Sequence, residues 1–163
     1  MALYHKAYNR DAAVAYAEKW ALSRNPAFYN FSGIGGDCTN FASQCIYAGC
    51  GVMNYTPVTG WFYRSANDRT ASWTGVSYLY NFLTGNAGTG PYAAVVRRDE
   101  ILPGDVVQLG LADGTFYHTP VVLASEGGEI YVAAHDYDAL WRPLSSYIYD
   151  RIRYLHIKGA RYY

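Results

Sequence analysis

The stretch Gly-Gly-Asp-Cys-Thr-Asn-Phe-Ala-Ser-Gln-Cys at residues 35–45 joins a glycine-rich turn directly to an apolar run with helical spacing. From Cys38 onward, apolar and small residues recur at intervals of three, four, seven, eight and eleven positions, which is one face of a helix. The pattern predicts a buried helix that begins at Cys38 and ends near Gly49 and Gly51. Unpaired N–H groups and the positive dipole end at a helix start stabilise a thiolate, the form that attacks a carbonyl carbon. Cys38 is therefore the candidate nucleophile.

The three cysteines are expected to differ in environment. Most free cysteines are small buried hydrophobes, and Cys45, two turns further along the same face, fits that description. Cys38 follows two glycines and an acidic residue, which predicts an exposed turn rather than a core position. An odd number of cysteines cannot form a complete internal disulfide framework, and no Cys-x-x-Cys pair suggests a metal knuckle. We expect no metal and no cofactor; a zinc site of Cys45, Cys50 and a histidine is the remote alternative.

The composition narrows the possible partners. The chain has 163 residues, a formal net charge of zero and no shift in composition, which predicts a single domain over residues 1–163 and neither nucleic-acid binding nor attraction to an anionic membrane. Its 18 tyrosines suit partly wet grooves. No apolar run approaches a membrane span, and residues 1–5 lack the features of a signal peptide. The chain is either cytoplasmic or an excised domain, and its start almost directly in a helical pattern favours excision.

The order of predicted elements indicates an α+β fold. An amphipathic helix is expected over residues 9–24, a connector over residues 27–36, and a short helix from about Ser72 within a long aromatic and glycine-containing region at residues 52–96. Four strands are expected at residues 105–109, 118–124, 129–135 and 148–157. Residues 127–128, both glycine, mark a hairpin. N-terminal helices should pack on a small antiparallel sheet.

A cysteine nucleophile needs an imidazole base and a group that orients it. Of the four histidines, His118 lies at the mouth of a hydrophobic strand, a poor place for packing but a good one for reaching a helix start across a cleft. In an antiparallel hairpin the numbers of two paired residues add to a constant, which is 255 for a two-residue loop here and 253 for a four-residue loop. With either sum an even-numbered residue pairs with an odd-numbered one, so odd-numbered residues of the return strand share the side of His118. This selects His135 over Asp136 as the orienting residue. A bulge in residues 133–136 would reverse the choice and favour Asp136.

Several motifs resemble those of known families. The block at residues 35–45, Leu-Pro-Gly-Asp-Val-Val at residues 102–107, and His118 followed by a polar residue after the hairpin resemble papain-like cysteine amidases and peptidases of the NlpC and CHAP type. Tyr-Asn-Arg at residues 8–10, Asn-Pro at residues 25–26 and Trp-Thr-Gly-Val at residues 73–76 resemble, together with that block, the bacterial putative amidase domain family. The similarity spans nearly the whole chain, and the block around Cys38 is its specific part.

The resemblance implies a papain-like α+β fold and an amidase or endopeptidase, a hydrolase in which Cys38 attacks an amide carbonyl, His118 is the base and His135 takes the orienting position. It implies bacterial cell-wall peptide, or peptidoglycan, as substrate, and a secreted or cell-envelope location for the parent protein. Tyr29 and Asp37 are the candidates for contacts to the substrate or the oxyanion. The alternatives are a degenerate domain that binds cell-wall glycopeptide without cleaving it, and a transglutaminase-like acyl transferase.

Overall fold

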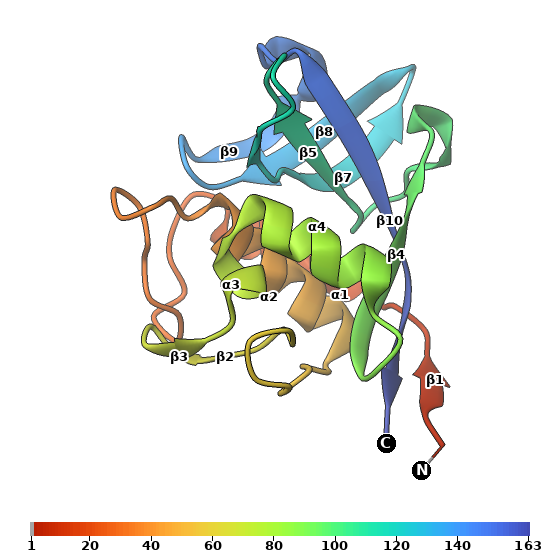
Figure 1. Ribbon diagram of the computed structural model, residues 1–163. Helices are drawn as coiled ribbons and strands as arrows, with labels where there is room; N and C mark the ends of the chain where they lie inside the picture. The colour runs from red at the N-terminus through yellow and green to blue at the C-terminus, as the bar shows by residue number, and fades with distance from the viewer. Residues whose placement is uncertain (1) are drawn as a thin grey trace.

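The run that begins at Cys38 forms α2 (Cys38–Cys50), which lies among the helices on one side of the sheet in the computed structural model of residues 2–163 (Figure 1). The helix begins where the sequence predicted. It is capped at its end by Gly51, whose φ of 68° is a left-handed conformation that glycine adopts without steric cost. Eleven of its 13 residues are buried, so the helix is enclosed on nearly all sides.

Three further helices surround α2. The helix α1 (Arg10–Trp20) begins at Asn9, whose side chain accepts a hydrogen bond from the N–H of Ala12 and so satisfies one of the unpaired donors of the first turn. The short α3 (Ala71–Thr74) and the longer α4 (Val76–Gly85) meet at Gly75. The predicted helices near residues 9–24 and after Ser72 are therefore present, the second as two segments.

An eight-stranded antiparallel sheet covers one side of these helices (Figure 1). Its longest strand, β10, pairs with β5, β4 and β1 along its length, and the path continues from β5 through β7 and β8 to β9. The strands are β1 (Tyr4–Lys6), β4 (Gly90–Val96), β5 (Val106–Gly110), β6 (Phe116–His118), β7 (Val121–Glu126), β8 (Glu129–Ala134), β9 (Ala139–Pro143) and β10 (Arg151–Tyr162). A separate hairpin pairs β2 (Tyr63–Ser65) with β3 (Asp68–Arg69). The predicted α+β arrangement is confirmed.

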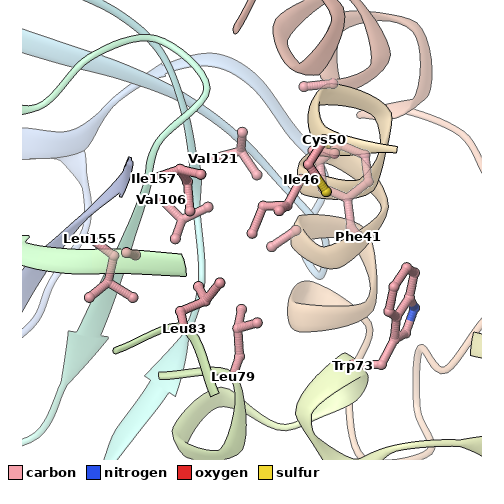
Figure 2. Packing of buried hydrophobic residues seen from close by; sticks show 14 of the residues in the cluster. Phe41, Ile46, Cys50, Trp73, Leu79, Leu83, Val106, Val121, Leu155 and Ile157 are labelled. Carbon is pink, nitrogen blue, oxygen red and sulfur yellow. The ribbon is translucent and has the colours of Figure 1, made fainter. Parts of the chain in front are cut away.

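The curled sheet has apolar side chains on both faces. Figure 2 shows Ile46 of α2 directed toward Val106 and Val121 of the sheet, with Leu79 and Leu83 of α4 beside them. The next residues along the same strands, Val107 and Val122, belong to a second buried cluster. Because neighbouring residues of a strand point to opposite faces, each face of the sheet contributes to its own buried cluster.

The hairpin of β7 and β8 differs from the predicted register. Near Gly127 and Gly128 the paired residues are Glu126 with Glu129 and Ala124 with Tyr131, which matches the predicted sum of 255. A bulge between Val122 and Ala124 then changes the pairing to Val122 with Val132. The sum falls to 254, and a one-residue slip exchanges the two sides of a strand.

This shifted register does not extend to the candidate residues, because His118 lies in β6, which pairs with β5, and His135 and Asp136 follow β8 in a turn. The prediction of a constant sum was therefore wrong, and the pairing does not decide between His135 and Asp136. The predicted strand at residues 118–124 is also interrupted, since His118 ends β6 and β7 begins only after Pro120, whose ring nitrogen has no hydrogen to donate.

Among residues 2–163, no helix is both long and apolar enough to cross a membrane.

Gly49 of α2 lies too close to neighbouring atoms for a side chain to fit without cost. A Cβ atom there would lie 2.4 Å from a ring carbon of Tyr8 and 2.9 Å from the carbonyl oxygen of Asn9. We expect Gly49→Ala to lower the free energy of unfolding by about 1–3 kcal/mol, the usual cost of overpacking, in urea denaturation. Gly85→Ala in α4 is the matched control, since a Cβ there meets nothing within 4 Å; it should be neutral or stabilise by up to about 1 kcal/mol. Equal effects of the two substitutions would contradict this close packing.

Candidate active site

Cys38 faces a cavity of about 620 Å³ at the start of α2. The walls come from the turn before α2, the junction of α3 and α4, the end of β6, the segment that follows β8, and β9 with the segment after it. The lining residues are Gly35, Gly36, Cys38, Thr74, Gly75, Val76, Tyr117, His118, Asp136, Tyr137, Arg142 and Tyr147. Cys38 and His118, predicted from the sequence as nucleophile and base, thus lie on the same cavity.

The thiol of Cys38 is buried, with 8% of the residue exposed, which corrects the expectation of an exposed turn. Its Sγ lies 3.7 Å from Oγ1 of Thr39 and 3.9 Å from the carbonyl oxygen of Tyr117. Burial raises the pKa of the thiol above its ordinary value, and the hydrogen bond from Thr39 offsets this only in part. The expected stabilisation of a thiolate by the helix start is therefore outweighed by loss of solvent, and the resting group is the neutral thiol.

The imidazole of His118 lies at the end of β6 between aromatic rings. Its centroid is 6.4 Å from that of Tyr117, nearly parallel at 13°, and 5.6 Å from that of Tyr147. Burial lowers the pKa of His118 to about 4; Asp136 opposes this shift and Arg142 adds to it. The ring is therefore neutral at pH 7, the form that can accept a proton.

Asp136 is held at the edge of the same cavity by two hydrogen bonds. Its Oδ1 accepts from the hydroxyl of Ser32 at 2.8 Å, and its Oδ2 accepts from the backbone N–H of Asp37 at 2.8 Å. Gly36 makes this approach possible, since its φ is 100° and a Cβ there would lie 3.0 Å from Oδ2 of Asp136. The glycine pair noted in the sequence thus admits a carboxylate beside the start of α2.

His135, the predicted orienting residue, occupies a different position. It is buried and stacks on Phe41, with ring centroids 4.1 Å apart. Its Nδ1 is 2.6 Å from Oδ2 of Asp37, and its Nε2 is 2.9 Å from the carbonyl oxygen of Trp20. Among residues 2–163, those lining the cavity include Asp136 but not His135, so the structure does not bring His135 together with Cys38 and His118.

The carboxylate of Asp37 is directed away from the cavity, toward His135. Besides that contact, its Oδ1 accepts from the backbone N–H of Phe31 and from Nδ2 of Asn40. Burial alone would raise the pKa of Asp37, but the hydrogen bonds from His135, Asn40 and Phe31 lower it below its usual value. Asp37 therefore anchors the turn before α2 to the helix, and only its backbone N–H reaches a residue of the cavity wall.

Tyr29, the other candidate for a substrate contact, lies beside the turn. Its backbone N–H donates to the hydroxyl of Tyr63 at 2.7 Å, and its ring packs edge-on against Phe31. The cavity walls within residues 2–163 do not include it. A substrate contact by Tyr29 stays a prediction.

Arg24 contributes to the site and was missed in the sequence. Its guanidinium forms two hydrogen bonds with the carboxylate of Asp138, at 2.8 and 2.9 Å, and a third with Oγ of Ser32 at 3.1 Å. It thereby links the turn that contains Ser32 to the segment that contains Asp138, the two segments that flank Asp136 in space. No local pattern could have revealed this, because Arg24 and Asp138 are 114 positions apart.

Within the described residues 2–163, no group of three His, Cys, Asp or Glu side chains is placed to hold a metal ion.

A raised thiol pKa has a direct kinetic consequence. We expect alkylation of Cys38 by iodoacetamide to accelerate about tenfold per pH unit between pH 6 and 8.5, because only the thiolate reacts. Site-resolved mass spectrometry on the folded protein measures this. Cys45, fully buried, is the internal control and should label only after unfolding. A Cys38 rate that is already constant below pH 7 would indicate a preformed thiolate instead.

Two substitutions separate the effect of the contact between Gly36 and Asp136 on stability from the effect of backbone strain. Gly36→Ala and Gly35→Ala both place alanine at a positive φ, at a cost of about 1–2 kcal/mol each. A Cβ at Gly35 meets nothing within 4 Å. Gly36→Ala should lower the free energy of unfolding by about 1 kcal/mol more than Gly35→Ala, since it displaces Asp136 from its hydrogen bond to Asp37. Equal losses would show that the carboxylate is not held against the turn.

Comparisons with known proteins identify the family of the chain. Residues 7–157 match the family described as "Putative amidase domain". The chain is 39% identical over 140 residues to the uncharacterized protein YhbB of Bacillus subtilis (strain 168), covering 83% of this chain and 43% of YhbB. It is 27% identical over 143 residues to the uncharacterized protein YjcM of the same strain, covering 83% of this chain and 32% of YjcM.

The chain thus spans less than half the length of these two relatives. No solved structure matches it. Since the family match extends over nearly all of the sequence, the chain belongs to the putative amidase domain family.

Proposed function

We propose that this chain is a cysteine-dependent amide hydrolase with a papain-like fold. The observation that carries the proposal is that Cys38, His118 and Asp136, from three distant parts of the sequence, line one cavity. A thiol at a helix start, an imidazole on a facing strand and a carboxylate within electrostatic range of both are the groups that acyl transfer requires. The match to an amidase family supports the same reaction class.

The resting site holds a neutral thiol and a neutral imidazole, so attack and proton transfer are coupled. As Sγ of Cys38 adds to the amide carbonyl, His118 takes the thiol proton. We assign the backbone N–H of Cys38, at the start of α2, to stabilise the oxyanion. His118 then gives its proton to the leaving amine. A water molecule, deprotonated by His118, attacks the acyl carbon, the carbon–sulfur bond breaks, and His118 returns the proton to the sulfur of Cys38.

Asp136 is the residue we assign to stabilise the imidazolium that forms in this step. Its negative charge raises the pKa of His118 and so favours the imidazolium. It also raises the pKa of Cys38, which keeps the thiol neutral until its proton passes to the ring. His135 would act at a distance, through its bond to Asp37. The two residues are therefore assigned different roles: Asp136 faces the reacting groups, and His135 secures the turn that precedes the nucleophile.

Cell-wall peptide is the proposed substrate. We place the domain outside the cytoplasm, as part of a longer parent protein. The motifs shared with NlpC- and CHAP-type enzymes favour this substrate class, and the greater length of both relatives is compatible with additional domains in the parent. The aromatic walls of the cavity, from Tyr117, Tyr137 and Tyr147, suit a ligand with apolar and polar parts.

Digestion of purified bacterial peptidoglycan, followed by detection of new free amino groups, tests the proposal. Cys38→Ala and His118→Ala should each lower the rate by at least about 1,000-fold, and Asp136→Asn by about 10- to 100-fold. His135→Gln should act mainly on the free energy of unfolding, since its partners are structural. Cys45→Ala is the matched thiol control and should retain activity.

Two outcomes would redirect the assignment. Undiminished release of amino groups by Cys38→Ala would refute a thiol nucleophile. Loss of the His118-dependent pH profile in folded His135→Gln, but not in Asp136→Asn, would return the orienting role to His135. Addition of a primary amine separates hydrolysis from acyl transfer, because only a transferase gives products with the mass of the added amine.

A further inference from the structure

Arg142 is a cation on the cavity wall without an anionic partner. Within residues 2–163 no carboxylate lies within ion-pair distance of its guanidinium, whereas Arg10 and Arg24 pair with Asp105 and Asp138 at 2.8 Å. Arg142 is also the only lysine or arginine among the described residues that line the cavity. A half-buried guanidinium facing a partly apolar cavity is a strong site for an anion, because little water competes there.

The guanidinium is held in a fixed orientation. Its Nε donates to Oγ of Ser146 at 2.8 Å, and its Nη2 donates to the carbonyl oxygen of Ser146 at 3.2 Å. Its central carbon lies 3.6 Å from the ring centroid of Tyr147, a cation–π stack. Ser146 is itself fixed by a hydrogen bond to the carbonyl oxygen of Pro143. A planar group held this way loses little freedom when it binds a carboxylate.

We propose that Arg142 binds a carboxylate of the substrate next to the scissile amide, so that the enzyme selects acidic peptides. The inference rests on the proposed function and specifies its substrate class. The position of the other charge supports it: Asp136, on the same cavity, repels a substrate carboxylate and leaves Arg142 as its partner. The two charges together fix the direction in which an acidic peptide lies across Cys38.

Binding at Arg142 also affects the chemical step. The positive charge of Arg142 disfavours the imidazolium of His118, adding to the effect of burial, while Asp136 opposes it. A bound carboxylate neutralises Arg142 and so removes one barrier to proton transfer from Cys38. An acidic substrate should therefore react faster as well as bind more tightly.

The test uses one set of soluble peptidoglycan fragments in two forms: with free carboxylates, and with the carboxylates converted to carboxamides by carbodiimide and ammonia. We expect the wild type to cleave the free-acid fragments with a kcat/KM at least about tenfold higher, the effect of a charge-assisted hydrogen bond. Arg142→Gln should abolish this preference by slowing the acidic fragments while leaving the amidated fragments no slower than in the wild type. Arg142→Lys should keep part of it, since it retains the charge but not the planar group.

Controls separate this recognition from structural effects and from the hydrolase assignment. Arg97→Gln, at an exposed arginine outside the cavity, should leave the preference unchanged. Binding of both fragment forms to Cys38→Ala, measured by calorimetry, requires no turnover. If the wild type cleaves neither form, Arg142-dependent binding of the acidic form alone still supports the inference while the hydrolase proposal fails. Equal handling of the two forms, or an equal loss on both in Arg142→Gln, would overturn the inference.

Discussion

The buried carboxylate of Asp37 is the point on which the site depends. It lies at the N-terminal end of α2 and accepts hydrogen bonds from the turn, from the helix and from the end of β8, through Phe31, Asn40 and His135. A buried ionised group is costly unless every partner is present, so these three segments can occupy only one relative position. Cys38, the next residue, is thereby placed at the cavity with little freedom to move.

Burial, more than the helix dipole, sets the chemistry of this site. It raises the pKa of the Cys38 thiol and lowers that of the His118 imidazole, so both groups are neutral at rest. Transfer of a proton between them creates two charges in a region of low solvent access, where Asp136 and Arg142 exert opposite effects on the imidazolium. In the mechanism that we propose, what enters the cavity governs the reactivity of the thiol, and a substrate that neutralises Arg142 shifts the balance toward the charged pair.

The sequence predicted the elements that depend on local pattern and missed those that depend on distant partners. The start of α2 at Cys38 and the hairpin at Gly127 and Gly128 were evident because helical spacing and turn residues are local signals. The strand β4 was not predicted, since its pairing partner β10 lies some 60 residues away. The role of Arg24 and the burial of Cys38 follow from tertiary packing, which no local pattern reports.

The different positions of His135 and Asp136 arise in a turn. Both residues follow β8, and their side chains leave the turn in different directions, His135 toward the core and Asp136 toward the cavity. The sequence left the choice to a bulge in residues 133–136, whereas the structure has one between Val122 and Ala124 on the opposite strand. The outcome is favourable for both side chains: the aromatic imidazole stacks on Phe41 in the core, and the carboxylate meets N–H and O–H donors at the cavity edge. Burial of a carboxylate against Phe41 would be costly, so this placement of the two side chains is the more stable one.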